Sequence, residues 1–122
     1  MNAAPARFPR LLRVTRPQDF DRVFQTGSRA ASRELLVVAC GNELEYSRFG
    51  VSTGRKFGSS PRRNRARRLL REAFRLNRAD FPVGFDFIAV PRAPAFPDSL
   101  EAAAERLLRQ ACRATEQIRR TR

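Results

Sequence analysis

The spacing of apolar residues first predicts a short helix between Thr15 and Gly27. Phe20, Val23 and Phe24 recur at helical intervals, which is typical of a helix that buries one face. Thr15 is followed three residues later by glutamine, the spacing of a capping box, and Gly27 supplies a stop. We therefore expect the chain to enter its first helix close to Thr15.

Two compact segments then predict neighbouring strands. The apolar run 35–40 and the segment 48–53 are separated by Gly41 and Asn42, which together are typical of a turn. We therefore expect two adjacent strands joined by a turn.

A second helix is predicted over residues 60–75. Ser60 suits an N-cap and Pro61 suits a first helical turn, while Phe81 and Pro82 mark a definite end. Five apolar residues of this segment share one face of a helical wheel, which is the spacing that buries a stripe against a sheet. They are Ala66, Leu69, Leu70, Ala73 and Phe74.

A further strand and a last helix complete the pattern. Residues 85–90 alternate in polarity and end at Pro91, which predicts a strand. Asp98, with Glu101 three residues later, predicts the start of a helix. The apolar stripe expected for this helix is Leu100, Ala104, Leu107, Leu108 and Ala111.

The predicted order is helix, two or three strands, helix, strand and helix, with no internal repeat. At 122 residues the chain suits one domain, 1–122, and is short for two. The expected fold class is α+β, with helices and sheet packed as a two-layer α/β sandwich. Residues 1–14 lack periodicity and are expected to form an arm that orders only against the domain or its partner. Residues 115–122 are expected to form a flexible basic tail.

The charge of the chain points to a polyanionic partner. The 25 basic residues outnumber the 12 acidic ones and give a formal charge of +13, which favours nucleic acid as the partner. All of them but one are arginine, which suits bidentate contact with phosphate, although genome base composition would explain the same preference. Because no apolar stretch resembles a signal peptide or membrane span, we expect a cytoplasmic protein without membrane association.

The charge is concentrated around the predicted long helix. Between Arg48 and Arg78 there are eleven basic residues and one acid, Glu72. Solvated helix faces usually interleave glutamates with their arginines, so this composition favours phosphate binding over a solvated surface. Structured RNA would be contacted mainly through its phosphates, and duplex DNA stays physically possible. The helical wheel gathers an exposed ridge of Asn64, Arg68, Arg71 and Arg75, flanked by Arg67 and Arg78.

Few residues suit catalysis by the chain itself. There is no histidine, and the carboxylates are scattered, so no catalytic residue is assigned. Cys40 and Cys112 lack the spacing of a zinc site and are expected to be small buried residues. Whether the chain binds a metal is left open.

A long basic segment resembles the RNR signature of the bacterial ribonuclease P protein family. It consists of 55–58, Arg-Lys-Phe-Gly, followed by 62–74, Arg-Arg-Asn-Arg-Ala-Arg-Arg-Leu-Leu-Arg-Glu-Ala-Phe. The similarity extends to 19–27, 47–52 and 84–92, and so covers most of the chain. The resemblance implies the order α-β-β-β-α-β-α, a four-stranded sheet and a left-handed crossover between parallel strands, whereas general topology rules favour a right-handed one.

The resemblance also implies a function in a ribonucleoprotein. The chain would be the protein subunit of ribonuclease P, with ribonuclease P RNA and precursor tRNA as partners and no obligate protein partner. The RNA subunit, with bound Mg²⁺, would hydrolyse the 5′ leader from precursor tRNA. The residues implied to face the catalytic RNA are Arg55, Lys56, Arg62, Arg63, Asn64, Arg65, Arg67, Arg68, Arg71 and Arg75. The residues implied to line a cleft for the leader are Arg13, Phe20, Phe24, Leu36 and Val38.

Other interpretations compete at this point. The rings of Phe20 and Phe24 suit stacking on unpaired bases, but their spacing is equally that of core residues. A generic ribosomal or RNA-chaperone protein would share the size and charge of this chain, although not its extended signature. A DNA-binding module is a third possibility, for which the sequence has neither helix-turn-helix spacing nor zinc ligands.

Overall fold

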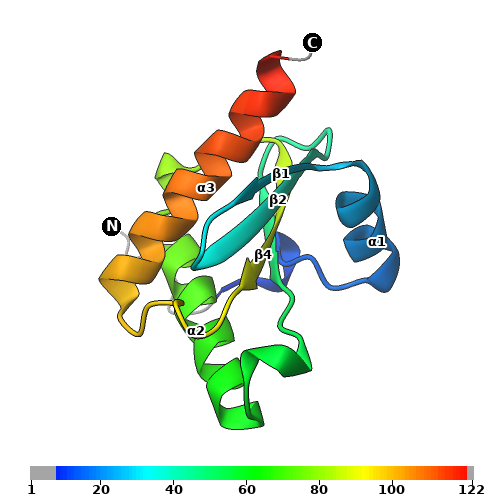
Figure 1. The fold of residues 1–122 in the computed structure, drawn as a ribbon. Coiled ribbons are helices and arrows are strands. Elements are labelled where there is room, and N and C mark those ends of the chain that lie inside the picture. Colours follow the sequence, from blue (N-terminus) through cyan, green and yellow to red (C-terminus); the bar gives the residue numbers. More distant parts are fainter. Residues whose placement is uncertain (1–7, 121–122) are drawn as a thin grey trace.

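Four strands and three α-helices follow one another along residues 8–120, the part of the chain that the computed structural model describes (Figure 1). Short 3₁₀ turns lie before α1, before α2 and after α2. The main elements are α1 (Pro17–Thr26), β1 (Ser28–Ala31), β2 (Leu35–Gly41), β3 (Arg48–Val51), α2 (Ser60–Leu76), β4 (Phe85–Pro91) and α3 (Leu100–Arg120). The 3₁₀ turns are η1 (Arg10–Leu12), η2 (Arg55–Phe57) and η3 (Arg78–Asp80).

The strands form one sheet in the order β1-β2-β4-β3. Strand β2 pairs antiparallel with both β1 and β4, whereas β3 runs parallel to β4 with Gly50 opposite Ile88. A parallel pair needs a crossover connection, and α2 supplies it between β3 and β4. The α+β class, the four-stranded sheet and the order of elements are confirmed. The left-handed sense of the crossover stays a prediction from the family resemblance.

The two faces of the sheet carry different helices. Because side chains alternate along a strand, Val37 and Ala89 belong to one face, and Val38 and Ile88 belong to the other. The first pair packs with α2 and α3, which form the second layer of the predicted sandwich. Helix α1 packs on the second pair and so covers part of the opposite face (Figure 1).

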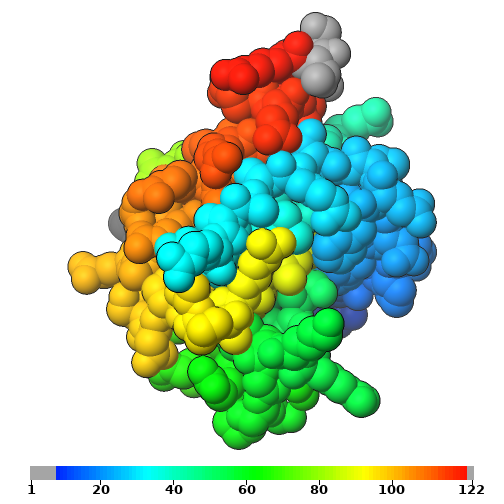
Figure 2. All heavy atoms as spheres, in the orientation of Figure 1, coloured from blue at the N-terminus to red at the C-terminus, as the bar shows by residue number. Residues whose placement is uncertain are grey.

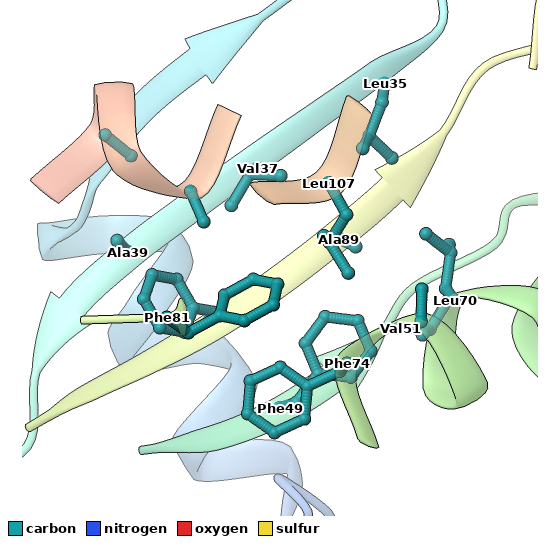
Figure 3. Packing of buried hydrophobic residues seen from close by; sticks show 14 of the residues in the cluster. Leu35, Val37, Ala39, Phe49, Val51, Leu70, Phe74, Phe81, Ala89 and Leu107 are labelled. Atoms are coloured by element: carbon teal, nitrogen blue, oxygen red, sulfur yellow. The ribbon is translucent and has the colours of Figure 1, made fainter. Parts of the chain in front are cut away.

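Aromatic rings fill the core between the sheet and α2 (Figure 3). The ring of Phe74 stacks on Phe49 with centroids 4.8 Å apart and lies 4.9 Å from Phe81. Phe8 meets the edge of Phe74 at 5.7 Å, so the expected N-terminal arm is ordered against the domain from this residue onward. Burial of each such ring stabilises the fold by about 1.5–3 kcal/mol. The rest of the expected arm, 1–7, lies outside the described residues.

Helix α3 continues through most of the expected tail. It extends to Arg120, and Thr115 is buried against the core, so residues 115–120 are helical. Residues 121–122 of that tail lie outside the described range. The buried stripe is rotated from the predicted one, since Leu100, Ala104 and Leu108 are only half-buried. The fully buried residues are Ala103, Leu107, Gln110, Ala111, Ala114 and Thr115.

The starts of the helices differ in detail from the sequence prediction. Helix α1 begins at Pro17 without a side-chain cap, so the capping box at Thr15 is wrong; a proline suits the first turn because its φ is already helical. The N-cap of α2 is Ser59 and not the next serine. At the start of α3 the hydroxyl oxygen of Ser99 accepts a hydrogen bond from the backbone N–H of Ala102 at 3.2 Å. Asp98, where the helix was predicted to start, accepts a hydrogen bond from Arg65 of α2 instead.

Candidate RNA interface

Helix α2 presents one face to the core and one to solvent. Ala66, Leu70, Ala73 and Phe74 are buried as predicted, and Leu69 is half-buried at the edge of this stripe. The remaining surface is basic, and we call it the arginine face. It consists of Arg62, Asn64, Arg65, Arg67, Arg68 and Arg71. At the start of the helix Arg55 and Lys56 of η2 are exposed beside it.

The arginines of this region differ in whether they already have hydrogen-bond partners within the protein. Arg63 donates to the carbonyl of Gly58 at 2.8 Å, and Arg67 donates to the side-chain oxygen of Asn64 at 2.9 Å. Within residues 8–120, no hydrogen bond or ion pair of the Arg68 guanidinium is recorded, and its side chain is exposed. The Arg68 guanidinium is therefore available to an anion without loss of an internal partner.

Arg75 does not lie on the exposed ridge where the helical wheel put it. Its side chain is 17% exposed and makes two hydrogen bonds to Glu72, at 3.0 and 2.6 Å. These bonds raise the pKa of Arg75 and lower the pKa of Glu72. The single glutamate of the helix thus balances Arg75, and the charge available to a ligand lies toward the N-terminal part of α2.

One further arginine, from the N-terminal segment, adds positive charge near Arg71 of the arginine face. Arg13 bridges to Phe49 at the outer edge of β3, and its guanidinium lies 5.4 Å from the centroid of the Phe8 ring. Desolvation lowers the pKa of Arg71, with further contributions from the positive charges of Arg13 and Arg67. Arg13, implied by the family resemblance to line the leader cleft, therefore also adds to the positive potential of the α2 side.

Aromatic and apolar side chains remain partly exposed where α1 meets the sheet. Phe20, Phe24, Leu36 and Val90 are half-buried, and we call this group the α1 surface. Val38 was expected in the leader cleft but is fully buried beneath α1, so it supports this surface from below and cannot touch a ligand. Both phenylalanine rings are thus partly core and partly accessible.

Glycine allows α1 to approach the sheet closely. A Cβ atom at Gly50 of β3 would lie 3.0 Å from the Cζ of Phe20, tighter than an ordinary van der Waals contact. A Cβ at Gly27 would lie 2.5 Å from the carbonyl oxygen of Val23, so only glycine fits where α1 turns into β1. The position of the Phe20 ring therefore depends on the absence of a side chain at Gly50.

A buried carboxylate ties α1 to the sheet. Asp86 of β4 is fully buried and accepts hydrogen bonds from Arg22 of α1 at 2.5 Å, from Arg48 of β3 at 2.9 and 2.6 Å, and from Asn42 at 2.9 Å. Burial alone would raise the pKa of Asp86, but these hydrogen bonds and the charge of Arg48 outweigh it and hold the pKa below its ordinary value. Asp19 is buried beside the same two arginines.

These positioning residues were not predicted from the sequence. An acid within the otherwise apolar segment 85–90 is a signal that a buried charge needs partners. The partners themselves, Arg22 and Arg48, stand 64 and 38 residues away along the chain, so no local pattern identifies them.

Other candidate sites are sparse in the described part of the chain. Within residues 8–120 no group of three or more histidine, cysteine, aspartate or glutamate side chains is placed to hold a metal ion. The same residues contain no helix with the length and apolar character needed to cross a membrane. Cys112 is exposed and Cys40 is half-buried, so the expectation that both are small buried residues is wrong.

A strongly basic helix on one side of a sheet, with partly exposed aromatic rings on the other, defines a class of α+β proteins suited to binding RNA phosphates and unpaired bases. The Ribonuclease P family model matches residues 8–116. The chain belongs to this family, whose members are protein subunits of the endoribonuclease that processes the 5′ end of tRNA.

Individual relatives agree with this assignment. The chain is 45% identical over 75 residues to the ribonuclease P protein component of Pelotomaculum thermopropionicum, covering 62% of this chain and 67% of that protein. It is 39% identical over 104 residues to the corresponding protein of Chloroflexus aggregans, covering 82% and 77%. The solved structure of the RNase P protein from Thermotoga maritima superposes with a TM-score of 0.75 at 32% identity, covering 83% of this chain and 96% of that one.

Proposed function

We propose that the arginine face binds ribonuclease P RNA while the α1 surface receives the 5′ leader of precursor tRNA. The observation that carries this proposal is the separation of the two surfaces. Exposed cations lie on α2, which packs on one face of the sheet, and accessible rings lie on α1, which packs on the other. A protein built in this way holds two RNA segments at once, one mainly by phosphates and one by stacking on bases.

The chemistry of cleavage is assigned to the RNA. Magnesium held by ribonuclease P RNA would supply the Lewis-acid chemistry of hydrolysis. The chain contributes positive charge, which lowers the repulsion between precursor tRNA and the catalytic RNA. Such an assembly works in the cytoplasm, where precursor tRNA is processed. A generic RNA-chaperone role is not favoured, because it does not explain the match to the family over residues 8–116.

The leader is proposed to contact Phe20, Phe24 and Leu36, the members of the predicted cleft that belong to the α1 surface. Arg13 is also half-buried, but its guanidinium lies over the Phe8 ring. Aromatic stacking contributes about 1–3 kcal/mol per base and tolerates any sequence, as a leader site must. Aliphatic residues line β2 here, so α1 provides the stacking rings.

The test compares precursor tRNA, which has a leader, with mature tRNA, which lacks one. With the reconstituted holoenzyme, Phe24→Ala should weaken precursor binding by about 5- to 150-fold and leave mature tRNA binding unchanged. Arg62→Gln on the arginine face should weaken assembly with the RNA subunit and preserve the preference for precursor. Equal losses for both tRNAs in Phe24→Ala would contradict the assignment of the leader to the α1 surface.

A further inference from the structure

Beside the arginine face lies a pocket that neither the sequence nor the family resemblance assigns. Its volume is about 370 Å³, and it opens between the N-terminal part of α2 and the loop that follows β4. Figure 2 shows this loop, in yellow, next to the green surface of α2. The residues that determine its chemistry are Phe57, Phe96, Arg62, Arg65 and Asp98.

The walls of the pocket suit a planar ring. Phe57 of η2 and Phe96 of the loop meet edge to face, with centroids 5.9 Å apart and planes at 74°. Both rings are half-buried, and Pro94 and Pro97 complete the apolar lining. Aromatic faces of this kind bind unstacked nucleobases, and the volume is enough for one nucleoside.

The polar groups of the pocket distinguish among the bases. Asp98 is 81% exposed at the side-chain level, and Arg65 donates to its Oδ1 at 2.5 Å, which fixes the carboxylate at the mouth of the pocket. An ionised carboxylate only accepts hydrogen bonds. Guanine is the one RNA base that presents two adjacent donors, N1–H and N2–H, on its Watson–Crick edge. Arg62 is exposed at the same mouth and is available to a phosphate.

We infer that this pocket takes one unpaired guanosine of ribonuclease P RNA, with the base stacked against the aromatic wall that Phe57 and Phe96 form, its Watson–Crick edge on Asp98 and its phosphate on Arg62. This inference rests on the proposal that α2 faces the RNA. A second hollow, which shares Arg65 and Leu69 with the first, continues along α2 to Arg68. The neighbouring phosphate of the RNA strand therefore reaches the arginine face directly.

Two variants test the pocket with little risk to the fold. Phe96→Leu keeps apolar volume against the core but removes the aromatic plane, and Asp98→Asn changes only an exposed carboxylate. General electrostatics predicts that losing an acid tightens RNA binding, because Asp98→Asn adds positive charge and frees Arg65. The pocket predicts the opposite sign, a weakening of about 5-fold or more for each variant. Asp80→Asn, an exposed aspartate beyond α2, is the matched control for charge.

The decisive measurement is chemical probing of the RNA with kethoxal, which modifies the N1 and N2 positions of unpaired guanine. The wild-type chain should protect one guanine of ribonuclease P RNA, and Phe96→Leu and Asp98→Asn should expose that guanine while the rest of the footprint stays. If both variants keep the complete wild-type footprint, the pocket inference is wrong and the proposed function stands. If wild type gives no footprint on the RNA, both fall.

A free guanine nucleotide would offer the pocket the same base and phosphate as the RNA does. Isothermal titration calorimetry of the isolated chain with 5′-GMP, compared with 5′-AMP, tests whether the pocket binds the free nucleotide. Weak or undetectable binding of 5′-GMP together with a protected guanine supports the RNA as the source. Saturable 5′-GMP binding that depends on Asp98, without a protected guanine, would overturn the assignment to ribonuclease P RNA.

Discussion

Replacing Arg68 by glutamine should remove one phosphate contact from the arginine face without disturbing the fold. The Arg68 side chain is exposed, and no internal partner of it is recorded within residues 8–120. A hydrogen bond to a charged group contributes about 1.5–3 kcal/mol, and a solvated charge pair at contact about 1 kcal/mol. We therefore expect a loss of about 1–2 kcal/mol, which corresponds to a 5- to 30-fold higher Kd for ribonuclease P RNA.

The assay is fluorescence anisotropy with labelled ribonuclease P RNA over a range of salt concentrations. Loss of one phosphate contact should reduce the slope of log K against log salt by about 0.7–0.9. Arg109→Gln is the matched control, since Arg109 is an exposed arginine on α3 that already pairs with Glu105. Unchanged affinity and slope in Arg68→Gln, or an equal change in Arg109→Gln, would refute the assignment of phosphate binding to the arginine face.

Three further predictions concern the RNA assembly and the support of α1. Arg62→Gln combined with Arg68→Gln should raise the Mg²⁺ concentration needed for half-maximal holoenzyme cleavage, and an unchanged requirement would remove the proposed charge effect. Gly50→Ala should displace the Phe20 ring and so reduce the preference for precursor over mature tRNA. It should also lower the free energy of unfolding in urea by about 1–3 kcal/mol. An unchanged preference for precursor would contradict the idea that Gly50 positions the Phe20 ring for the leader. Asp86→Asn should destabilise the fold by about 3–5 kcal/mol, because it removes the buried charge that Arg22 and Arg48 bind, and a loss below 1 kcal/mol would argue against this.

The carboxylate of Asp86 makes the stability of the fold depend on pH, and the sign of this dependence follows from the lowered pKa of Asp86. Because the pKa of Asp86 is lower in the folded chain than in the unfolded chain, its stabilisation is complete above the ordinary value of 3.8. It is lost as the pH falls through the folded value. Urea unfolding of wild type and Asp86→Asn between pH 7 and pH 3 should therefore show a constant difference at first and a smaller one in acid. A difference that grows in acid would contradict this sign.

Amphipathic periodicity explains why α2 was predictable. Ala66, Leu70, Ala73 and Phe74 follow one another at helical spacing, and this local pattern alone orients the basic residues outward. Arg75 departs from the wheel because its long side chain folds back onto Glu72, a choice that depends on rotamers and not on spacing. The direction of a helix face is thus readable from sequence, whereas the end position of a long charged side chain is not.

Elements defined by distant contacts were harder to predict. Strand β1 has the sequence Ser-Arg-Ala-Ala, with no β-branched or aromatic residue, and it becomes a strand because β2 offers a pairing edge. The full burial of Val38 follows from the place where α1 lies, which the pattern of β2 does not reveal. The pocket beside Arg65 depends on Phe96 and Asp98, more than thirty residues further along the chain.

The central claim is that this chain assists a catalytic RNA and does not cut RNA by itself. The most direct measurement is release of the 5′ leader from precursor tRNA at low Mg²⁺, with the chain and ribonuclease P RNA combined and with each alone. We expect cleavage to be strongly stimulated when both are present and to be undetectable with the chain alone. Leader release by the chain alone, or no stimulation of the RNA at any chain concentration, would contradict the account.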